Sequence, residues 1–239
     1  MSVSVTSWLD NNIYPSFADN WDDWAARQKI LEYLRPEGVV LDLGAGAGVV
    51  PHMNFFGLAE RVCGIDPDAV VLSNPHLDEC RVGSGESIPF EDATFDLVFS
   101  NNVLEHLSES GAVFAEVYRV LKPGGVFVIK TPNRFHYVAM LARLTPLRLH
   151  KCINRLRGRC ESDTYPTEYR ANSSAALRRL AAAANFRIIE MSFIEGRPEY
   201  LRLFWPAYVL GAIYERLVNS IALLSRFRVV IIAVFRKEA

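Results

Sequence analysis

The sequence lacks the features that mark secreted, disulfide-linked or membrane-spanning proteins. Its four cysteines form no Cys-x-x-Cys pair, which argues against a disulfide framework and a zinc site. The first ten residues, MSVSVTSWLD, have neither the basic start nor the apolar run of a secretory signal. The apolar stretch 203–214 is too short to span a bilayer. We therefore expect a cytoplasmic protein without a transmembrane segment.

An excess of either charge is also missing. The chain carries 26 basic and 27 acidic residues, for a net charge of −1, so no overall positive field favours nucleic acid as a partner. Repeats and low-complexity linkers are absent. Half of the 239 residues are hydrophobic, which is enough for a sizeable core and argues against disorder.

The hydrophobic pattern predicts strands that alternate with helices. Apolar runs bounded by turn residues predict strands at 39–43, 61–66, 80–83, 95–100, 125–131, 186–193 and 228–235, and amphipathic spacing predicts helices at 19–34, 109–121 and 173–184. Continuous apolar strands suit a parallel sheet that is covered on both faces. The order of the elements predicts an α/β fold with right-handed crossovers.

A glycine-rich loop follows the first predicted strand. In Gly44-Ala45-Gly46-Ala47-Gly48 the glycines let the chain turn sharply between strand and helix, and let a ligand approach the backbone. Asp66 stands at the tip of the next strand, where a carboxylate can accept both hydroxyls of an adenosine ribose. Either feature alone could be a tight turn or a helix cap. Together they favour nucleotide binding, although Val49 breaks the Gly-x-Gly-x-x-Gly dinucleotide pattern.

Five segments carry a resemblance to a known family. They are VVLDLGAGAG at 39–48, VCGIDPD at 62–68, GSGESIPFEDATFDLVF at 83–99, NNVLEHL at 101–107 and EVYRVLKPGGVFVIK at 116–130. In this order they resemble the class I methyltransferases of the small-molecule type, which use S-adenosylmethionine (SAM). The resemblance implies a Rossmann-like, doubly wound, mostly parallel sheet of seven strands, with an antiparallel last strand and insertions after strands 5 and 6.

The resemblance also divides the chain and assigns a cofactor site. One domain, 1–239, would comprise a helical cap at 1–37, a SAM-binding core at 38–131, a substrate-facing insertion at 133–172 and a second half at 173–239 with a helical insertion at 197–225. The cofactor-binding residues would be Asp42, Gly44, Ala45 and Gly46 at the methionine part, Asp66 and Pro67 at the ribose, Ser84, Gly85 and Glu86 at the adenine, and Asn101 and Asn102 over the cofactor. The positive end of the helix after the loop would lie near the SAM carboxylate. Ser84 departs from the pattern, because relatives usually have an aspartate there.

Methyl transfer to a hydroxyl acceptor needs a general base. The catalytic candidates are His106, His136 and Tyr137, and a structural histidine is the alternative for His106. Glu105 and His106 have no partners at metal-ligand spacing, so no metal is expected.

Two segments bear on the acceptor. Residues 133–160 hold seven basic side chains and no acidic one (Arg134, Arg143, Arg148, Lys151, Arg155, Arg157, Arg159). This run favours an anionic acceptor of the small-molecule, glycan or lipid type, or a membrane surface. The alternative is a solvated face that the acidic residues after it balance. The apolar side chains of 203–225 are typical of core or a subunit contact, or of a lid over a lipid-like acceptor. The predicted function is SAM-dependent methyl transfer. The alternatives are a SAM-binding protein without catalysis and a nucleotide-dependent oxidoreductase. The oligomeric state is not indicated.

Overall fold

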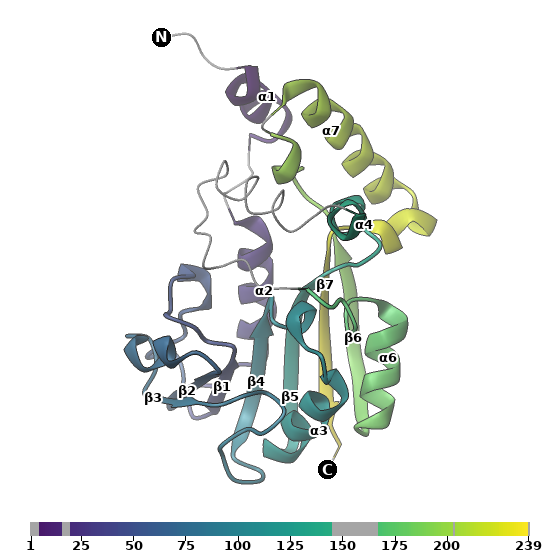
Figure 1. The fold of residues 1–239 in the computed structure, drawn as a ribbon. Helices are drawn as coiled ribbons and strands as arrows, with labels where there is room; N and C mark the ends of the chain where they lie inside the picture. The colour runs from purple at the N-terminus through teal and green to yellow at the C-terminus, as the bar shows by residue number, and fades with distance from the viewer. Residues whose placement is uncertain (1–4, 16–19, 145–166, 203, 239) are drawn as a thin grey trace.

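The computed structural model describes residues 5–15, 20–144, 167–202 and 204–238, which fold around one seven-stranded sheet (Figure 1). The strands are β1 (Val39–Leu43), β2 (Arg61–Asp66), β3 (Glu79–Val82), β4 (Phe95–Asn101), β5 (Leu121–Pro132), β6 (Phe186–Ile194) and β7 (Val230–Lys237). Their order is β3-β2-β1-β4-β5-β7-β6, and only β7 runs antiparallel to its neighbours. The predicted fold class is therefore confirmed.

Helices cover both faces of the sheet because its strands are apolar on both sides. On one face α2 (Trp21–Leu31) places Ile30 against Val40 and Val128. On the other face α3 (Ser110–Val120) and α6 (Ser174–Ala183) pack a cluster centred on Phe114. The side chain of Ser173 begins α6 by accepting a 3.3 Å hydrogen bond from the Ala176 N–H, as an N-cap does.

The expected helix after the glycine loop is not formed. Between β1 and β2 the chain has a single 3₁₀ turn, Pro51–Met53, followed by turns. Pro51 and Gly57, which has a φ of 74°, leave too little uninterrupted chain for an α-helix. Phe55 fills the space instead, fully buried and edge-on to Phe99 at 5.0 Å between ring centroids. The predicted stabilisation of an anion by that helix terminus is therefore wrong.

Three helices lie beyond the carboxyl ends of β4 and β5 (Figure 1). They are α1 (Val5–Ile13), which the hydrophobic pattern did not indicate, α4 (Tyr137–Leu144), in a stretch predicted to be irregular, and α7 (Trp205–Ser220). Helix α7 starts earlier than the predicted second half of 197–225, because Pro206 favours a helix start there. Most of the predicted basic run, from 145 to 160, lies outside the described residues.

The three helices form what is here called the cap. Tyr208 and Ala212 of α7 pack on Leu9 of α1 and on Tyr14, and Tyr137 of α4 lies edge-on to Tyr214 of α7 at 5.0 Å. Among the described residues, none of the helices combines the length and apolar character needed to cross a bilayer.

Candidate active site

The glycine loop turns directly off the end of β1. Gly44 and Gly48 have φ values of 84° and 73°, a region that L side chains rarely adopt. A Cβ on Gly44 would collide with Val103, and one on Gly48 would collide with Asn74. At Gly46 nothing stands within 4 Å of an added Cβ, so the loop is open to an approaching group at this point.

Asp66, at the tip of β2, is tied to the loop. Its Oδ2 accepts a 3.1 Å hydrogen bond from the Gly46 N–H, and its Oδ1 accepts one of 2.9 Å from the Asp68 N–H. Asp42 lies on the neighbouring strand and is 8% exposed. Burial, and then the nearby Asp66 carboxylate, raise the pKa of Asp42 well above 3.8. The two carboxyl groups therefore differ in character, one solvated in part and the other buried.

A cavity of about 150 Å³ opens beside the loop. It is lined by Asp42, residues 44–50, Met53, Asn54, Asn74, His76, Leu77 and Asn101. Of the predicted cofactor residues, Asp42, Gly44, Ala45, Gly46 and Asn101 thus meet at one cavity, whereas Asp66, Pro67, Ser84, Gly85, Glu86 and Asn102 are not in its lining.

Asn74 is a residue of this site that sequence reasoning missed. Its side-chain Nδ2 donates to the carbonyl oxygens of Ala45 and Gly46, at 3.1 and 3.2 Å, and the residue is 7% exposed. It therefore fixes the loop from the side of the β2–β3 connection. A polar residue before Pro75, with no motif around it, gave no sequence signal for this role.

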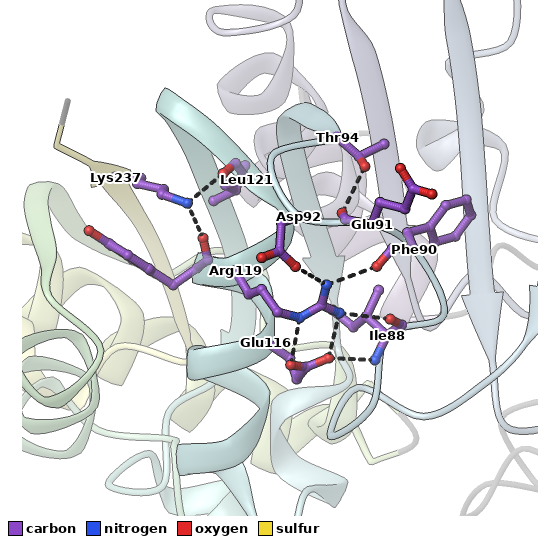
Figure 2. Close-up of polar contacts among 10 residues, drawn as sticks. Ile88, Phe90, Glu91, Asp92, Thr94, Glu116, Arg119, Leu121 and Lys237 are labelled. Carbon is purple, nitrogen blue, oxygen red and sulfur yellow. Dashed lines mark hydrogen bonds and ion pairs between the residues drawn. The ribbon is translucent and has the colours of Figure 1, made fainter.

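The turn at Ser84–Glu86 reaches the tip of β2 through a 3.0 Å hydrogen bond from the Gly83 N–H to the Asp66 carbonyl. The segment after it is held by Arg119 of α3, as Figure 2 shows. The Arg119 guanidinium donates to the carbonyls of Ile88 and Phe90, both at 2.9 Å, and to the Asp92 carboxylate at 2.7 Å. Arg119 thereby anchors this loop to the helix.

A buried ion cluster closes the site on the side of β4 and β5. Lys130 Nζ, on a side chain that is 1% exposed, lies 2.6 Å from carboxylate oxygens of both Asp22 and Asp23, in the first turn of α2. Asn101 Nδ2 also donates to Asp23, at 2.9 Å. The Oδ1 of Asn101 is buried and has no hydrogen-bond partner among the described residues. Sequence reasoning missed this cluster, for which a lysine within an apolar strand is a possible signal but does not name its partners.

His136 is placed unlike a free general base. It is 2% exposed, and its Nδ1 accepts from the Val138 N–H at 3.3 Å. Its Nε2 lies 3.4 Å from Glu195 Oε2, without a well-aligned hydrogen bond. Nδ1 is thus engaged as an acceptor, and Nε2 faces a buried carboxylate. This geometry favours a structural role for His136.

Tyr137 stacks on His136, with 4.1 Å between ring centroids. Burial, and then the Glu195 carboxylate, raise the pKa of Tyr137 above its ordinary value. A phenol in this setting stays protonated, so it can donate a hydrogen bond to an acceptor but does not accept a proton.

Glu105 and His106 lie shortly after β4, in the 3₁₀ turn Leu104–His106. The Glu105 carboxylate is buried and accepts from the Thr131 hydroxyl at 3.3 Å. Burial raises the pKa of Glu105. His106 is half-buried beside it. Glu105, which sequence reasoning considered only as a metal ligand, is thus a carboxyl group of perturbed pKa at the carboxyl edge of the sheet.

Part of the chain is similar to known proteins. Residues 41–129 match the family described as methyltransferase domain. A protein of Mycolicibacterium smegmatis described as a probable S-adenosylmethionine-dependent methyltransferase is 36% identical over 113 residues, 45% of this chain and 42% of that one. Malonyl-[acyl-carrier protein] O-methyltransferase of Yersinia pestis is 36% identical over 98 residues, 39% of this chain and 36% of that one. The chain thus spans about two fifths of the length of these relatives.

Solved structures share the fold over most of the chain. The YcgJ protein of Bacillus subtilis has a TM-score of 0.56 at 18% identity and covers 92% of this chain and 99% of its own. Geranyl diphosphate C-methyltransferase of Streptomyces coelicolor, solved with S-adenosyl-L-homocysteine, has a TM-score of 0.55 at 15% identity, over 89% of this chain and 78% of its own. Residues 41–129 thus resemble a methyltransferase domain, and the fold of the described residues resembles that of solved methyltransferases.

Proposed function

We propose that this chain binds SAM beside the glycine loop and catalyses methyl transfer to a small-molecule, glycan or lipid-type acceptor. The observation that carries the proposal is the joined geometry of the open loop at Gly46, the Asp66 carboxylate bonded to it and the adjoining cavity. The residues fit the cofactor, because a loop that is open at Gly46 and a carboxylate at a neighbouring strand tip suit a nucleoside ligand.

The proposed contacts follow the sequence prediction with one addition. Asp66 and Pro67 would hold the ribose, and Ser84, Gly85 and Glu86 would face the adenine. Asp42, Gly44, Ala45, Gly46, Asn101 and Asn102 would surround the methionine part. The buried, unpaired Oδ1 of Asn101 supports a donor on the ligand at this position. Asn74 is added as the residue that holds the loop in shape.

When bound, SAM supplies an electrophilic methyl group on a sulfonium. The protein's part is then to orient the acceptor and exclude water, and correct positioning can contribute about 7–11 kcal/mol to lowering the barrier. The Lys130 cluster fixes the first turn of α2 against β4 and β5, so that this wall of the site is rigid. A proton from a hydroxyl acceptor would go to Glu105 or His106, which lie in the 3₁₀ turn at the carboxyl edge of the sheet.

The proposed class of acceptor rests on the names of similar proteins and on Arg134. Relatives act, by their names, on malonyl-[acyl-carrier protein] and geranyl diphosphate, and both names denote an anionic group on an organic chain. Arg134, which begins the predicted basic run, has a buried Nε without a hydrogen-bond partner among the described residues. These features support a small, anionic acceptor.

Titration calorimetry with SAM and with NAD, followed by transfer of a tritiated methyl group from SAM to a metabolite and lipid extract, tests the proposal. We expect SAM to bind, NAD not to bind, and label to enter an organic product. Binding of SAM with no label transferred to any extract would support the non-catalytic alternative. Preferential binding of NAD would support the oxidoreductase.

A further inference from the structure

Helix α7 is apolar on two opposite faces, and only one of them is covered by the residues that the structure describes. The inner face buries Tyr208, Ala212 and Val218, which are at most 4% exposed. The opposite side, here called the α7 outer face, consists of Leu210, Ile213, Leu217 and Ile221, and these are 67, 51, 48 and 44% exposed. Their spacing of three or four residues aligns them in one stripe along the helix.

An exposed apolar stripe of this kind indicates a binding partner. A surface helix normally carries polar residues on the side that faces solvent, and a contiguous exposed apolar patch marks an interaction site. Trp205 at the start of the helix and Leu223 just after its end are also exposed, by 53 and 71%. Figure 1 shows α7 on the outside of the cap, at the end of the molecule beyond β4 and β5.

The charges around the stripe indicate which partner fits. Between residues 204 and 229 the only acid is Glu215, whose side chain is 15% exposed and accepts from the Tyr14 hydroxyl and from Asn219. Arg216 on the helix and Arg226 just after it are exposed. Arg216 lies 3.5 Å from Glu215, and Arg226 has no ion pair within the part of the chain that the structure describes. The surface is therefore apolar and cationic.

A second copy of the chain fits this surface poorly. A two-fold symmetric interface brings the same patch against itself, so the arginines of one copy would meet those of the other, with no exposed carboxylate on the patch to pair with. An anionic lipid surface satisfies both features, because the apolar stripe can enter the acyl boundary while the arginines reach lipid phosphates.

We propose that the α7 outer face docks the protein on an anionic lipid surface. The helix then lies in the plane of the membrane, and the cap end of the sheet, where β4 and β5 finish, faces the bilayer. The docking does not depend on methyl transfer, so it can be tested independently of the proposed function.

The test is flotation with lipid vesicles. The full chain is mixed with vesicles of equal parts phosphatidylglycerol and phosphatidylcholine, and with vesicles of phosphatidylcholine alone. The double variant Leu210→Gln/Leu217→Gln is compared with Leu58→Gln/Leu72→Gln, which changes leucines near β2 and β3 that are 42 and 59% exposed. We expect the α7 variant to lose roughly tenfold or more in affinity for anionic vesicles, and the control to match the wild type. Added salt should weaken binding.

Three results would overturn the docking proposal. The first is no flotation of the wild type with anionic vesicles at low salt, and the second is equal flotation of the two double variants. The third is a wild-type dimer, measured by light scattering, that becomes a monomer in the α7 variant, since this would assign the face to a second copy. A SAM titration on the same samples separates the two proposals, because vesicle binding without SAM binding would contradict only the proposed function.

Discussion

The two halves of the candidate site are built differently. On the side of β1 and β2 the shape comes from backbone, because the glycine loop is held by carbonyl and N–H groups that Asn74 and Asp66 satisfy. On the side of β4, β5 and the cap it comes from buried side chains, such as Lys130 with two aspartates and His136 beside Glu195. We therefore expect the first half to be the more sensitive to changes of backbone, and the second to the loss of buried charged partners.

Removing the buried lysine should produce the largest effect. Lys130→Met leaves the carboxylates of Asp22 and Asp23 without their cation, and we expect the free energy of unfolding to fall by about 3 kcal/mol or more. Lys122→Met is the matched control, because its pair with Asp96 is 40 and 33% exposed, and it should cost less than about 1 kcal/mol. Urea unfolding measures both, and equal losses would show that burial does not distinguish the two pairs.

The backbone half is tested by Gly44→Ala. A side chain there would adopt a positive φ and collide with Val103, so we expect a loss of stability of about 1–3 kcal/mol together with weaker SAM binding. Gly111→Ala is the control, because a Cβ on this helical glycine meets nothing within 4 Å. It should be neutral or stabilising by up to about 1 kcal/mol. Thermal unfolding that ranks the two variants the other way would contradict the loop geometry.

Asp42 is an exception in the backbone half, since it is a buried carboxyl group. Its pKa in the folded protein is raised above 3.8 by burial and by Asp66. The folded state therefore holds the proton more tightly than the unfolded state does. The stability that the bound proton contributes is fully present below about pH 3.8 and is lost as the pH rises through the raised pKa. In Asp42→Asn this loss of stability with rising pH is absent, because the amide does not ionise. Its stability relative to the wild type should grow by up to about 1.4 kcal/mol per pH unit in that window.

Unfolding by urea at several pH values measures the Asp42 effect. Parallel pH profiles for the wild type and Asp42→Asn would mean that the carboxylate is not destabilised by burial.

The loop that carries Ser84 should show the smallest effect. Arg119→Lys keeps the charge but loses the fork that reaches Ile88, Phe90 and Asp92 at once. We expect a loss of about 1 kcal/mol in stability and a SAM affinity lowered severalfold. Arg178→Lys, on the exposed side of α6, is the control. Unchanged values for Arg119→Lys in both measurements would show that the loop is fixed by other contacts.

The contrast between the halves also explains what the sequence could predict. The strands and the glycine loop were readable, because a parallel sheet demands apolar runs and a positive φ demands glycine. The pairing of Lys130 with Asp23, 107 residues apart, leaves no local pattern, and neither does that of His136 with Glu195. The missing helix after Gly48 was not foreseen, because a buried Phe55 can replace a helix face only in the folded chain.

The most direct test of the account is the affinity of SAM for Asp66→Ala, measured by calorimetry beside the wild type and the exposed control Glu60→Ala. Asp66 would lose its hydrogen bonds to the ribose and to the Gly46 N–H, so we predict a dissociation constant raised by roughly tenfold or more, with Glu60→Ala unchanged. An Asp66→Ala protein that stays folded and binds SAM as tightly as the wild type would contradict the proposed cofactor site.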